Sequence, residues 1–456
     1  MTRRPLALAL AFIAFSSGAR AEDLLQSYEL ARNSDPQFSA AESSRLFSRE
    51  GAVQARAAML PQLSGDAGYS RASSDSSSDI GPSDTSSDTT TRQYGLTLRQ
   101  MVYDHSNFTR LRSQGALAKA GDFQLEAAGD SLITRTSQAY FNVLIAMETL
   151  AAAEAQEVAL KKQFDFADKR LEVGLAPITD VHEARAQYDR ARANTIVTRN
   201  ALEDAYRALE EITGNDIRSL KALPQDFQPA LPSSMDSAGW VQAALDNNPA
   251  LKAKEYQVRS AEANVETARS GHLPTLYLGG SYGRSRSDGD STNNLLNLTQ
   301  AFENESNSRS VGLTLTVPIF SGGATQSQVR QALAQRDIST DELEQQKRAL
   351  VRNTRNAYEI LVAGISEVEA RKAAVFSARS AYDASQVGLE VGTRTVLDVL
   401  NNQQTLFNAE REYALARYNF LQNRLLLEQA AGTLDIDDLQ DVNRMLTVEA
   451  TVKSAP

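Results

Sequence analysis

The stretch Val173-Gly174-Leu175-Ala176-Pro177-Ile178-Thr179-Asp180-Val181 decides the fold, because a second form of it occurs as Val391-Gly392-Thr393-Arg394-Thr395-Val396-Leu397-Asp398-Val399. Each copy lies between two long, alanine-rich stretches with helical periodicity. Glycine ends a helix at little cost because it readily adopts the left-handed conformation, and proline suits the first turn of the helix that follows. The two copies therefore predict two helical hairpins, with tips near 174–180 and 392–398.

The two tips belong to a longer duplication. Their glycines, Gly174 and Gly392, are 218 residues apart, and other landmarks recur at separations of 213 to 218 residues. These landmarks are Pro36 with Pro249, Pro61 with Pro274, Tyr69 with Tyr282, Gly95–Leu98 with Gly312–Leu315, Tyr140 with Tyr358, and Thr213–Gly214 with Ala431–Gly432. This period is too long for a solenoid repeat, so we expect two copies of one supersecondary unit.

The duplication predicts how the chain is divided. We expect a first repeat at 22–214, a linker at 215–236, a second repeat at 237–432 and an acidic C-terminal tail at 433–456. Ahead of them stand a basic pair, an apolar run at 6–15 and Ala19-Arg20-Ala21, a pattern typical of a secretory signal peptide. We therefore interpret 1–21 as a signal peptide and expect the mature chain to be exported.

Four stretches alternate between apolar and small or polar residues, as β-strands do. They lie at about 62–71, 93–103, 275–284 and 309–320, with polar segments at 72–92 and 285–308 between them. Strands of about ten residues cross a bilayer at a tilt, with apolar side chains toward lipid. Ordinary hairpins on a soluble core would explain the alternation equally well. If the strands do span a membrane, four cannot close a barrel, and open edges in lipid would force the chain to oligomerise.

The remaining sequence is strongly helical. Proline-free patterns at about 106–173 and 324–391 lead to the two tips, and 178–213 and 395–431 return from them. At about 1.5 Å per residue, the first of these helices is about 100 Å long. Apolar residues of the last helix keep the spacings of a coiled-coil seam. These residues are Leu397, Leu400, Phe407, Ala414, Tyr418, Leu421 and Leu425. Helices of this length predict a tube or a rod.

Composition argues against several classes of function. The 456 residues carry a net charge of −10, which argues against a nucleic-acid partner. The chain has no cysteine, which excludes disulfides and thiolate metal sites. Its histidines, His105, His182 and His272, are far apart and lack metal-ligand spacing. We find no catalytic motif and expect neither an enzyme nor a cofactor or metal.

The twofold order of helix, strand, polar loop, strand and long helical hairpin resembles the TolC family of outer-membrane efflux and secretion ducts. The resemblance covers nearly the whole mature chain, and the absence of cysteine places it near the branch without a lipid anchor. Its most specific motifs are Val173-Gly174-Leu175, Ile178-Thr179-Asp180-Val181, Ala186-Gln187-Tyr188-Asp189, Val317-Pro318-Ile319-Phe320, Gly392-Thr393-Arg394-Thr395 and Asp398-Val399-Leu400.

The resemblance implies an α+β membrane protein. Its homotrimer would form a twelve-stranded β-barrel in the outer membrane, with four strands from each chain, continued by a coiled-coil barrel of helices in the periplasm. The implied function is passive export of small molecules (multidrug efflux) or proteins (type I secretion). The implied partners are a periplasmic adaptor and an inner-membrane transporter of the RND or ABC class, and the adaptor would dock at Gly174, Leu175, Gly392 and Thr393.

The resemblance also implies a gate at the periplasmic end of the tunnel. Polar links between neighbouring hairpins would hold it shut, and an acidic ring would favour cations. The matching residues here are Gln163, Thr179, Asp180 and Arg394 for the links and Asp398 for the ring.

Two positions depart from the family pattern. Leu389 replaces a tyrosine of the closing links, and Asn401 replaces a second acidic residue of the ring. These differences predict a looser and less negative entrance. A coiled-coil structural protein or adhesin of the cell envelope, without a channel, is the alternative that the sequence leaves open.

Overall fold

The computed structural model describes residues 22–76, 85–233, 235–294 and 296–450. The expected signal peptide at 1–21 lies outside these residues. The chain divides into two compact units. The first holds the residues up to Ala41, Glu126–Pro249 and those from Lys347 onward, and the second holds Glu42–Leu125 and Ala250–Gln346. Two long helices, α3 (His105–Glu172) and α7 (Ala324–Glu390), each contribute to both units.

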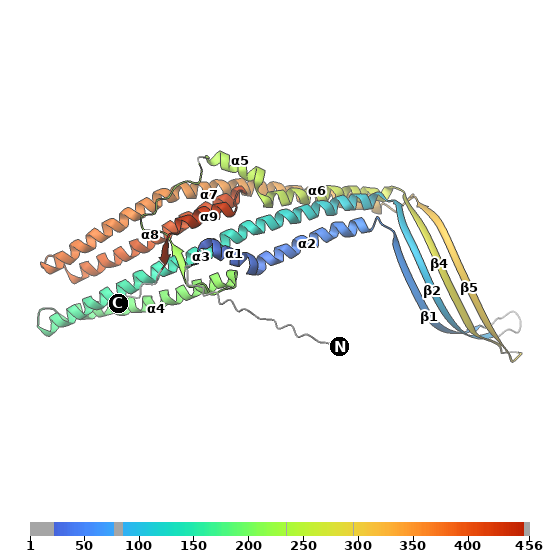
Figure 1. Cartoon of the computed structure of the whole chain (residues 1–456), viewed down its shortest axis with the longest axis horizontal. Helices are drawn as coiled ribbons and strands as arrows, with labels where there is room; N and C mark the ends of the chain where they lie inside the picture. The colour runs from blue at the N-terminus through green and yellow to red at the C-terminus, as the bar shows by residue number, and fades with distance from the viewer. Residues whose placement is uncertain (1–21, 77–84, 234, 295, 451–456) are drawn as a thin grey trace, which may run out of the picture. The chain divides into compact units, whose positions relative to one another are not determined.

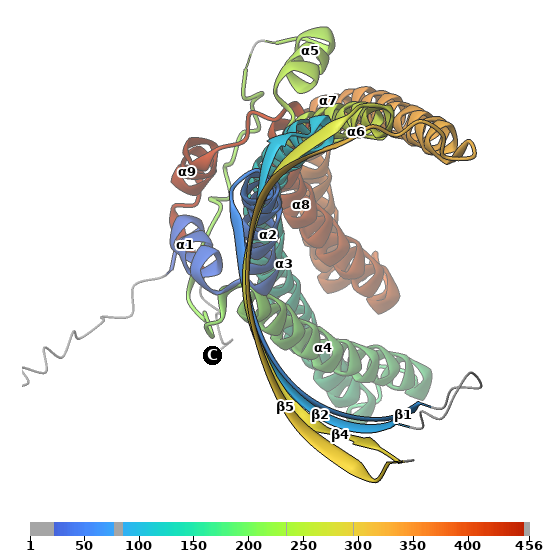
Figure 2. The ribbon, with the colours of Figure 1, turned by 90° about the vertical axis from the view of Figure 1, so that its right-hand side faces the viewer.

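A four-stranded antiparallel sheet dominates the second unit (Figure 1). Its strands are β1 (Gln62–Ser76), β2 (Thr85–Tyr103), β4 (Thr275–Asn293) and β5 (Leu298–Thr316), in the order β1-β2-β4-β5. The strands bend together along their length (Figure 2). Helices α2 (Pro36–Ala57) and α6 (Pro249–Arg269) precede the two strand pairs, with the short η1 (Ser270–His272) after α6. These matched elements are the two copies of one unit that the sequence predicts.

The strands are longer than expected, and much of the sequence assigned to polar loops is strand. Residues 72–76, 85–92, 285–293 and 298–308 all continue the ladder. Their backbone groups pair with the next strand without a register shift, from Ser76 opposite Thr85 to Thr85 opposite Asn293. Serine and threonine need no apolar core to remain in a ladder whose backbone hydrogen bonds are complete. The polar composition therefore concealed the outer halves of these strands.

One face of the sheet carries apolar side chains that the chain itself leaves exposed. Antiparallel register places them on the same face because directly opposite residues project together. Val311 is 83 % exposed and Leu63 is 71 % exposed. The other members are Tyr69, Tyr94, Leu96, Leu98, Leu278, Tyr282, Leu313 and Leu315. The opposite face presents small and polar residues such as Ser64, Thr97, Ser281 and Thr314.

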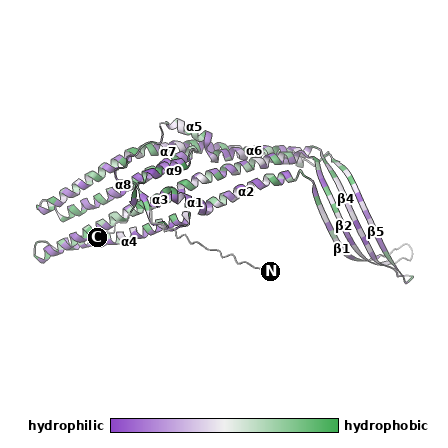
Figure 3. Cartoon of the chain, viewed as in Figure 1, coloured by the Kyte–Doolittle hydropathy of each residue, from purple (hydrophilic) through white to green (hydrophobic). Residues whose placement is uncertain are grey.

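Two helical hairpins form most of the first unit. The first joins α3 to α4 (Ile178–Thr213), and the second joins α7 to α8 (Val396–Ala431) (Figure 1). Ion pairs link α7 to α8, including Arg379 with Glu410 at 2.5 Å. No described helix is long and apolar enough to cross a membrane, and hydrophilic residues recur along every long helix (Figure 3).

The described parts of the linker and of the tail contain regular structure and pair with each other. Strand β3 (Leu220–Ala222) lies in the linker and pairs antiparallel with β6 (Val448–Ala450) of the tail. Glu22 joins their edge through a bridge to Leu220. Helices α1 (Leu24–Ser34), α5 (Ser237–Asn247) and α9 (Ile436–Met445) complete this region. The first and last described residues are therefore held beside the linker between the repeats.

A buried polar network fastens α8 to α3 near this small sheet. Arg417 donates from Nη2 to both oxygens of Glu148, at 2.9 and 2.8 Å, and from Nη1 to the carbonyl of Pro224 at 3.0 Å. The hydroxyl of Tyr418 also donates to Glu148, at 3.0 Å. The side chain of Arg417 is only 4 % exposed. A buried charge needs such partners because its desolvation is otherwise unfavourable, so these bonds fix the position of α8 along α3.

The C-terminal end of α8 buries a carboxylate against α9. Glu428 accepts a hydrogen bond from Nε of Arg424 at 3.1 Å, and its Oε2 is buried without a hydrogen bond from the described residues. Burial raises the pKa of Glu428 to about 7, Arg424 opposes that shift, and the neighbouring acids Asp438 and Asp441 add to it. The charged form is thus the less favourable one in the folded chain.

This carboxylate predicts a pH-dependent stability. Because its folded pKa lies above its ordinary value, the folded chain binds more protons than the unfolded chain between about pH 4.5 and 7. The contribution of Glu428 to stability should therefore fall as the pH rises through this window. Glu428→Gln should flatten the dependence of the thermal midpoint on pH and raise the midpoint at neutral pH. As a control, Glu210→Gln replaces a partly exposed glutamate that pairs with Arg207. An unaltered slope in Glu428→Gln would contradict this assignment.

Candidate functional site: the tips of the helical hairpins

The two hairpin tips share one backbone geometry. Gly174 and Gly392 have φ angles of 74° and 77°, in the left-handed region where side chains are strained. At the first tip the amide of Leu175 donates to the carbonyl of Arg170 at 2.8 Å. At the second tip the amide of Thr393 donates to the carbonyl of Gly388, also at 2.8 Å. Open space surrounds both glycines, so the backbone angle alone requires glycine at these positions.

The tips differ in how the returning helix begins. Thr395 caps α8, and its hydroxyl accepts a hydrogen bond from the amide of Asp398 at 3.2 Å. The carboxylate of Asp398 accepts in return from the amide and the hydroxyl of Thr395, at 3.0 and 2.9 Å. This reciprocal arrangement is a capping box. Pro177 occupies the corresponding position before α4 and makes no side-chain cap, because proline has neither a hydroxyl nor an N–H to offer.

The capping box changes the interpretation of Asp398. Hydrogen bonds from the amide and then the hydroxyl of Thr395 hold the pKa of Asp398 below its usual value, and the charge of Arg394 adds to this effect. The carboxylate is therefore ionised at neutral pH, as an acidic ring requires. It is also bonded to its own helix, so the residue predicted for an acidic ring is the cap partner of α8.

The described chain does not bring Arg394 and Asp180 together. Arg394 folds back over Gly388, and Asp180 has Thr179 beside it, with 3.5 Å between Thr179 Oγ1 and Asp180 Oδ1. Neither Arg394 nor Asp180 makes an ion pair with another residue that the structure describes. A link between these residues within one chain is thus absent from the described parts of the tips.

Gln163 lies on α3, before the first tip. Its Oε1 atom is buried and accepts no hydrogen bond from the described residues. A buried amide oxygen without a donor is unfavourable by about 1–3 kcal/mol. Gln163 therefore has an acceptor that the described residues leave unused.

Both tips expose apolar side chains. Val173 and Leu175 are each 68 % exposed at the first tip, with Ile178 nearby, and Val391 is similarly exposed at the second. Leu389 and Asn401, the two departures from the family pattern, lie on α7 and α8. The apolar tips thus carry more exposed hydrophobic surface than helix reversal requires.

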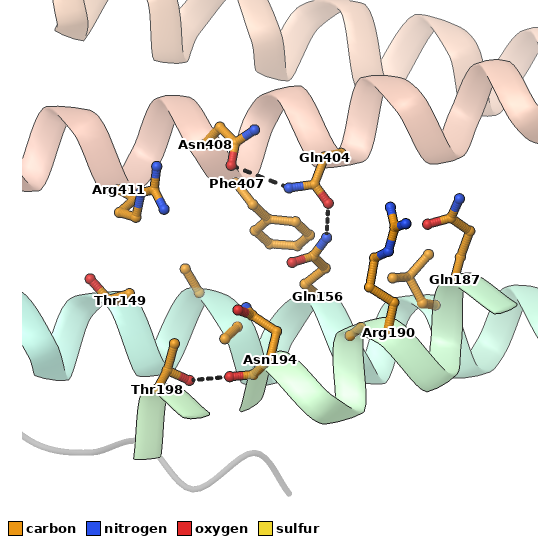
Figure 4. Close-up of a pocket in the computed structure, with 14 residues that line it drawn as sticks. Thr149, Gln156, Gln187, Arg190, Asn194, Thr198, Gln404, Phe407, Asn408 and Arg411 are labelled. Atoms are coloured by element: carbon orange, nitrogen blue, oxygen red, sulfur yellow. Dashed lines mark hydrogen bonds between the residues drawn. The ribbon is translucent and has the colours of Figure 1, made fainter. Parts of the chain in front are cut away.

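Behind the tips, a polar groove separates the hairpins. It has a volume of about 280 Å³ and lies between α3, α4 and α8 (Figure 4). Gln156 donates to Gln404 across the groove, and Gln404 donates to Asn408 at 3.2 Å. Arg190 and Arg411 also line it. An apolar contact between Leu160, Ala191 and Leu400 closes the end nearer the tips.

This groove was not predicted, although the sequence of α8 contains a signal for it. Gln404 follows Leu400 by four residues and Arg411 follows Phe407 by four residues, so polar side chains interrupt the apolar seam of α8 at helical spacing. The three histidines lie in different elements, with His105 beginning α3, His182 in α4 and His272 in η1. Among the residues described, no group of three or more histidine, aspartate or glutamate side chains could hold a metal.

The comparison with known families gives two matches, one for each half of the chain. The sequence model of the outer membrane efflux protein family matches residues 27–215 and again 240–433. The chain belongs to this family. The double match falls on the two halves that the duplicated landmarks define.

Similar outer membrane efflux proteins span almost the whole chain. The outer membrane protein TolC of Escherichia coli is 36% identical over 97% of this chain and 89% of its own length. The alkaline protease secretion protein AprF of Pseudomonas aeruginosa is 32% identical over 91% of this chain and 86% of its own length. The crystal structure of the CmeC outer membrane channel of Campylobacter jejuni matches with a TM-score of 0.75 and 20% identity, over 94% of this chain and 90% of that one.

These findings confirm the resemblance to the TolC family, the fold class and the location. The chain is an outer membrane efflux protein whose described residues include a four-stranded sheet and two long helical hairpins.

The capping box yields a prediction specific to the second tip. Thr395→Ala removes the cap hydroxyl and one donor to Asp398, which should destabilise the first turn of α8 by about 1 kcal/mol. Hydrogen–deuterium exchange of a peptide covering 391–402 should become faster. Pro177→Ala is the matched control because the first tip has no side-chain cap to lose. Equal effects of both substitutions on their own tips would contradict a role for the box.

Proposed function

We propose that the chain forms a homotrimeric, passive duct that exports small molecules, proteins or both across the outer membrane. The observation that carries this proposal is the pair of open edges of the sheet. β1 and β5 are the two outermost strands of the β1-β2-β4-β5 order, so each leaves one row of backbone groups without a strand partner. Lipid offers no hydrogen bonds to such groups. Pairing β5 of one chain with β1 of the next satisfies both edges.

The strand directions support this closure. All three pairings are antiparallel, so β1 and β5 run in opposite directions and can continue the same antiparallel pattern between chains. Three copies would give a twelve-stranded barrel and a helical tunnel, as the family resemblance implies. We also propose that 1–21 is removed and that 22–214 and 237–432 act as the two repeats, joined by 215–236 and followed by 433–456.

The relatives support both kinds of cargo. AprF is named for the secretion of alkaline protease, and BepC of Brucella suis is named an efflux protein. We propose that a periplasmic adaptor and an inner-membrane transporter of the RND or ABC class select the cargo, while the duct performs no covalent chemistry and uses no cofactor. Docking of the adaptor at Gly174, Leu175, Gly392 and Thr393 is supported by the exposed apolar side chains of Val173, Leu175 and Val391.

A gate formed between neighbouring hairpins accounts for the unused groups at the tips. We propose that Arg394 pairs with Asp180 of the adjacent hairpin in the trimer, that Thr179 supports this contact, and that Gln163 accepts a further hydrogen bond. A single ring of three Asp398 carboxylates, one from each chain, would attract cations to the entrance. Exposed ion pairs contribute only about 0–1 kcal/mol each, so the docking of a partner can open a gate of this kind.

Planar-bilayer recording of the purified full-length protein tests the duct and the gate together. Wild type should give a small, cation-selective conductance. Arg394→Ser should increase it several-fold because the link that opposes opening is lost. Asp180→Ser should have the same effect, and the double variant should add little to either, as two partners of one contact require.

Arg352→Ser supplies the control, since Arg352 lies on α7 and bonds to neighbouring Asn353. Conductance that Arg394→Ser leaves unchanged would retain the duct and remove the proposed gate residues. Folded trimers without any conductance would instead favour the alternative, a structural or adhesive protein of the cell envelope.

A further inference from the structure

Arginines gather on one face of the β-sheet, immediately beyond a row of tyrosines. The register pairs Tyr69 with Arg92, Tyr94 with Arg284, and Tyr282 with Arg309. Directly opposite residues of an antiparallel pair project to the same face, so these six side chains share the apolar face described above. Alternation along β1 and β4 adds Arg71 and Arg286 to that face. We call Arg71, Arg92, Arg284, Arg286 and Arg309 the arginine row.

The row is confined to this face. Arg99 is the one other arginine within the described strands; it lies on the opposite face, over the ring of Tyr277. Each of the four strands contributes at least one member to the row. In every strand the arginine is farther from the helices than the apolar residues are, with Leu63, Gly65, Ala67, Tyr69 and Arg71 in succession along this face of β1.

On this face, apolar residues are followed by tyrosines and then by arginines. This order matches the change from hydrocarbon to headgroups across a membrane leaflet. Tyrosines prefer the boundary between hydrocarbon and headgroups. An arginine one step beyond the tyrosine can extend its guanidinium to the depth of the lipid phosphates. Its planar donors fit phosphate oxygens in pairs. A lipid with phosphate groups therefore meets apolar, aromatic and cationic side chains at the depths that suit its own parts.

Carboxylates compete for part of the row. Arg284 pairs with Glu305 at 2.6 Å, Arg286 with Glu303 at 2.5 Å, and Arg92 with Asp288 at 3.2 Å. These side chains are about half exposed, and such exposed pairs are weak. Each guanidinium has five donors, so it can hold a carboxylate on the loop side and still offer donors to a phosphate.

Two features indicate that the arginine row binds an anion from outside the chain, and does not only form ion pairs with carboxylates of the strands. Arg92 and Arg286 are directly opposite each other in the register, so their like charges repel and an additional anion beside them is favourable even with Asp288 and Glu303 present. Arg71 and Arg309 make no ion pair with any described carboxylate, and Arg309 lies over the ring of Tyr282 at 5.6 Å. The row therefore has unused positive charge where the tyrosines end.

We propose that the arginine row binds the phosphate groups of anionic lipids in the leaflet nearest the loop ends of the strands. This inference rests on the proposed function, because it requires the sheet to span the membrane. It goes beyond that function by giving the outer wall of the barrel a defined lipid ligand.

Native mass spectrometry of the detergent-purified, full-length protein tests the proposal, with lipid A as the probe. The protein should retain lipid A and should retain dephosphorylated lipid A, which has the same acyl chains, much less. Arg71→Gln combined with Arg309→Gln should weaken retention about tenfold, since each arginine beside an anionic lipid surface adds substantially to binding. These two arginines are chosen because their loss leaves no described carboxylate without its partner.

Arg99→Gln combined with Arg336→Gln is the matched control, with the same loss of charge from the opposite face and from α7. It should retain lipid A as wild type does. Equal retention of phosphorylated and dephosphorylated lipid, or wild-type retention by Arg71→Gln/Arg309→Gln, would overturn the proposal.

Conductance measured on the same preparations separates the two ideas. A variant that conducts normally is folded, so its loss of lipid retention reports on the arginine row alone. Phosphate-dependent retention without conductance would overturn the duct and leave the lipid site standing. Normal conductance together with equal retention of phosphorylated and dephosphorylated lipid A would support the duct and overturn the lipid site.

Discussion

Every backbone N–H and C=O group in a membrane must find a partner within the protein, and this constraint governs the architecture. Within the chain, the ladder between β1, β2, β4 and β5 satisfies most of these groups over strands of 15 to 19 residues. The outer edges of β1 and β5 remain open. Three features of the chain fit a membrane barrel only when another copy closes those edges. They are the exposed apolar face, the antiparallel strand directions and the internal duplication.

The helical part solves a different problem, which is to hold long elements in register. Bonds from Arg417 and Tyr418 to Glu148 fix α8 against α3, and the hydroxyl of Tyr140 accepts from the amide of Lys221 at 2.8 Å. The small β3-β6 sheet joins the linker to the tail. These contacts are distant in sequence, so they determine where each hairpin starts, while the coiled-coil seams determine only how its helices pair.

The sequence was informative where a backbone constraint requires one residue type. Gly174 and Gly392 could be recognised because no other residue adopts their angles easily, and alternation indicated the four strands. Strand length was missed because serine and threonine suit both a ladder and a loop. The pairing of the linker with the tail was missed because three-residue strands leave almost no pattern.

The candidate site was predictable only in part. The position of Asp398 in the repeat identifies it as a residue of the second tip. The Thr395-x-x-Asp398 spacing also fits a capping box, and the structure shows that box. The proposed link between Arg394 and Asp180 joins hairpins of two neighbouring chains, so the structure of one chain does not display it. Gln156 and Gln404 escaped notice because a polar residue in an apolar seam resembles an ordinary surface position until the facing helix is known.

The unequal caps of α4 and α8 mean that a trimer would contain two kinds of hairpin in alternation. Helix α8 begins with a capping box, whereas α4 begins with a proline and no side-chain cap. A missing cap lowers the cost of local unfolding by about 1 kcal/mol. The first turn of α4 should therefore open and reclose more often than that of α8. Duplication supplied two similar hairpins. They differ at the cap position, Pro177 in the first and Thr395 in the second, and this difference makes the start of α4 the segment that unfolds locally more easily.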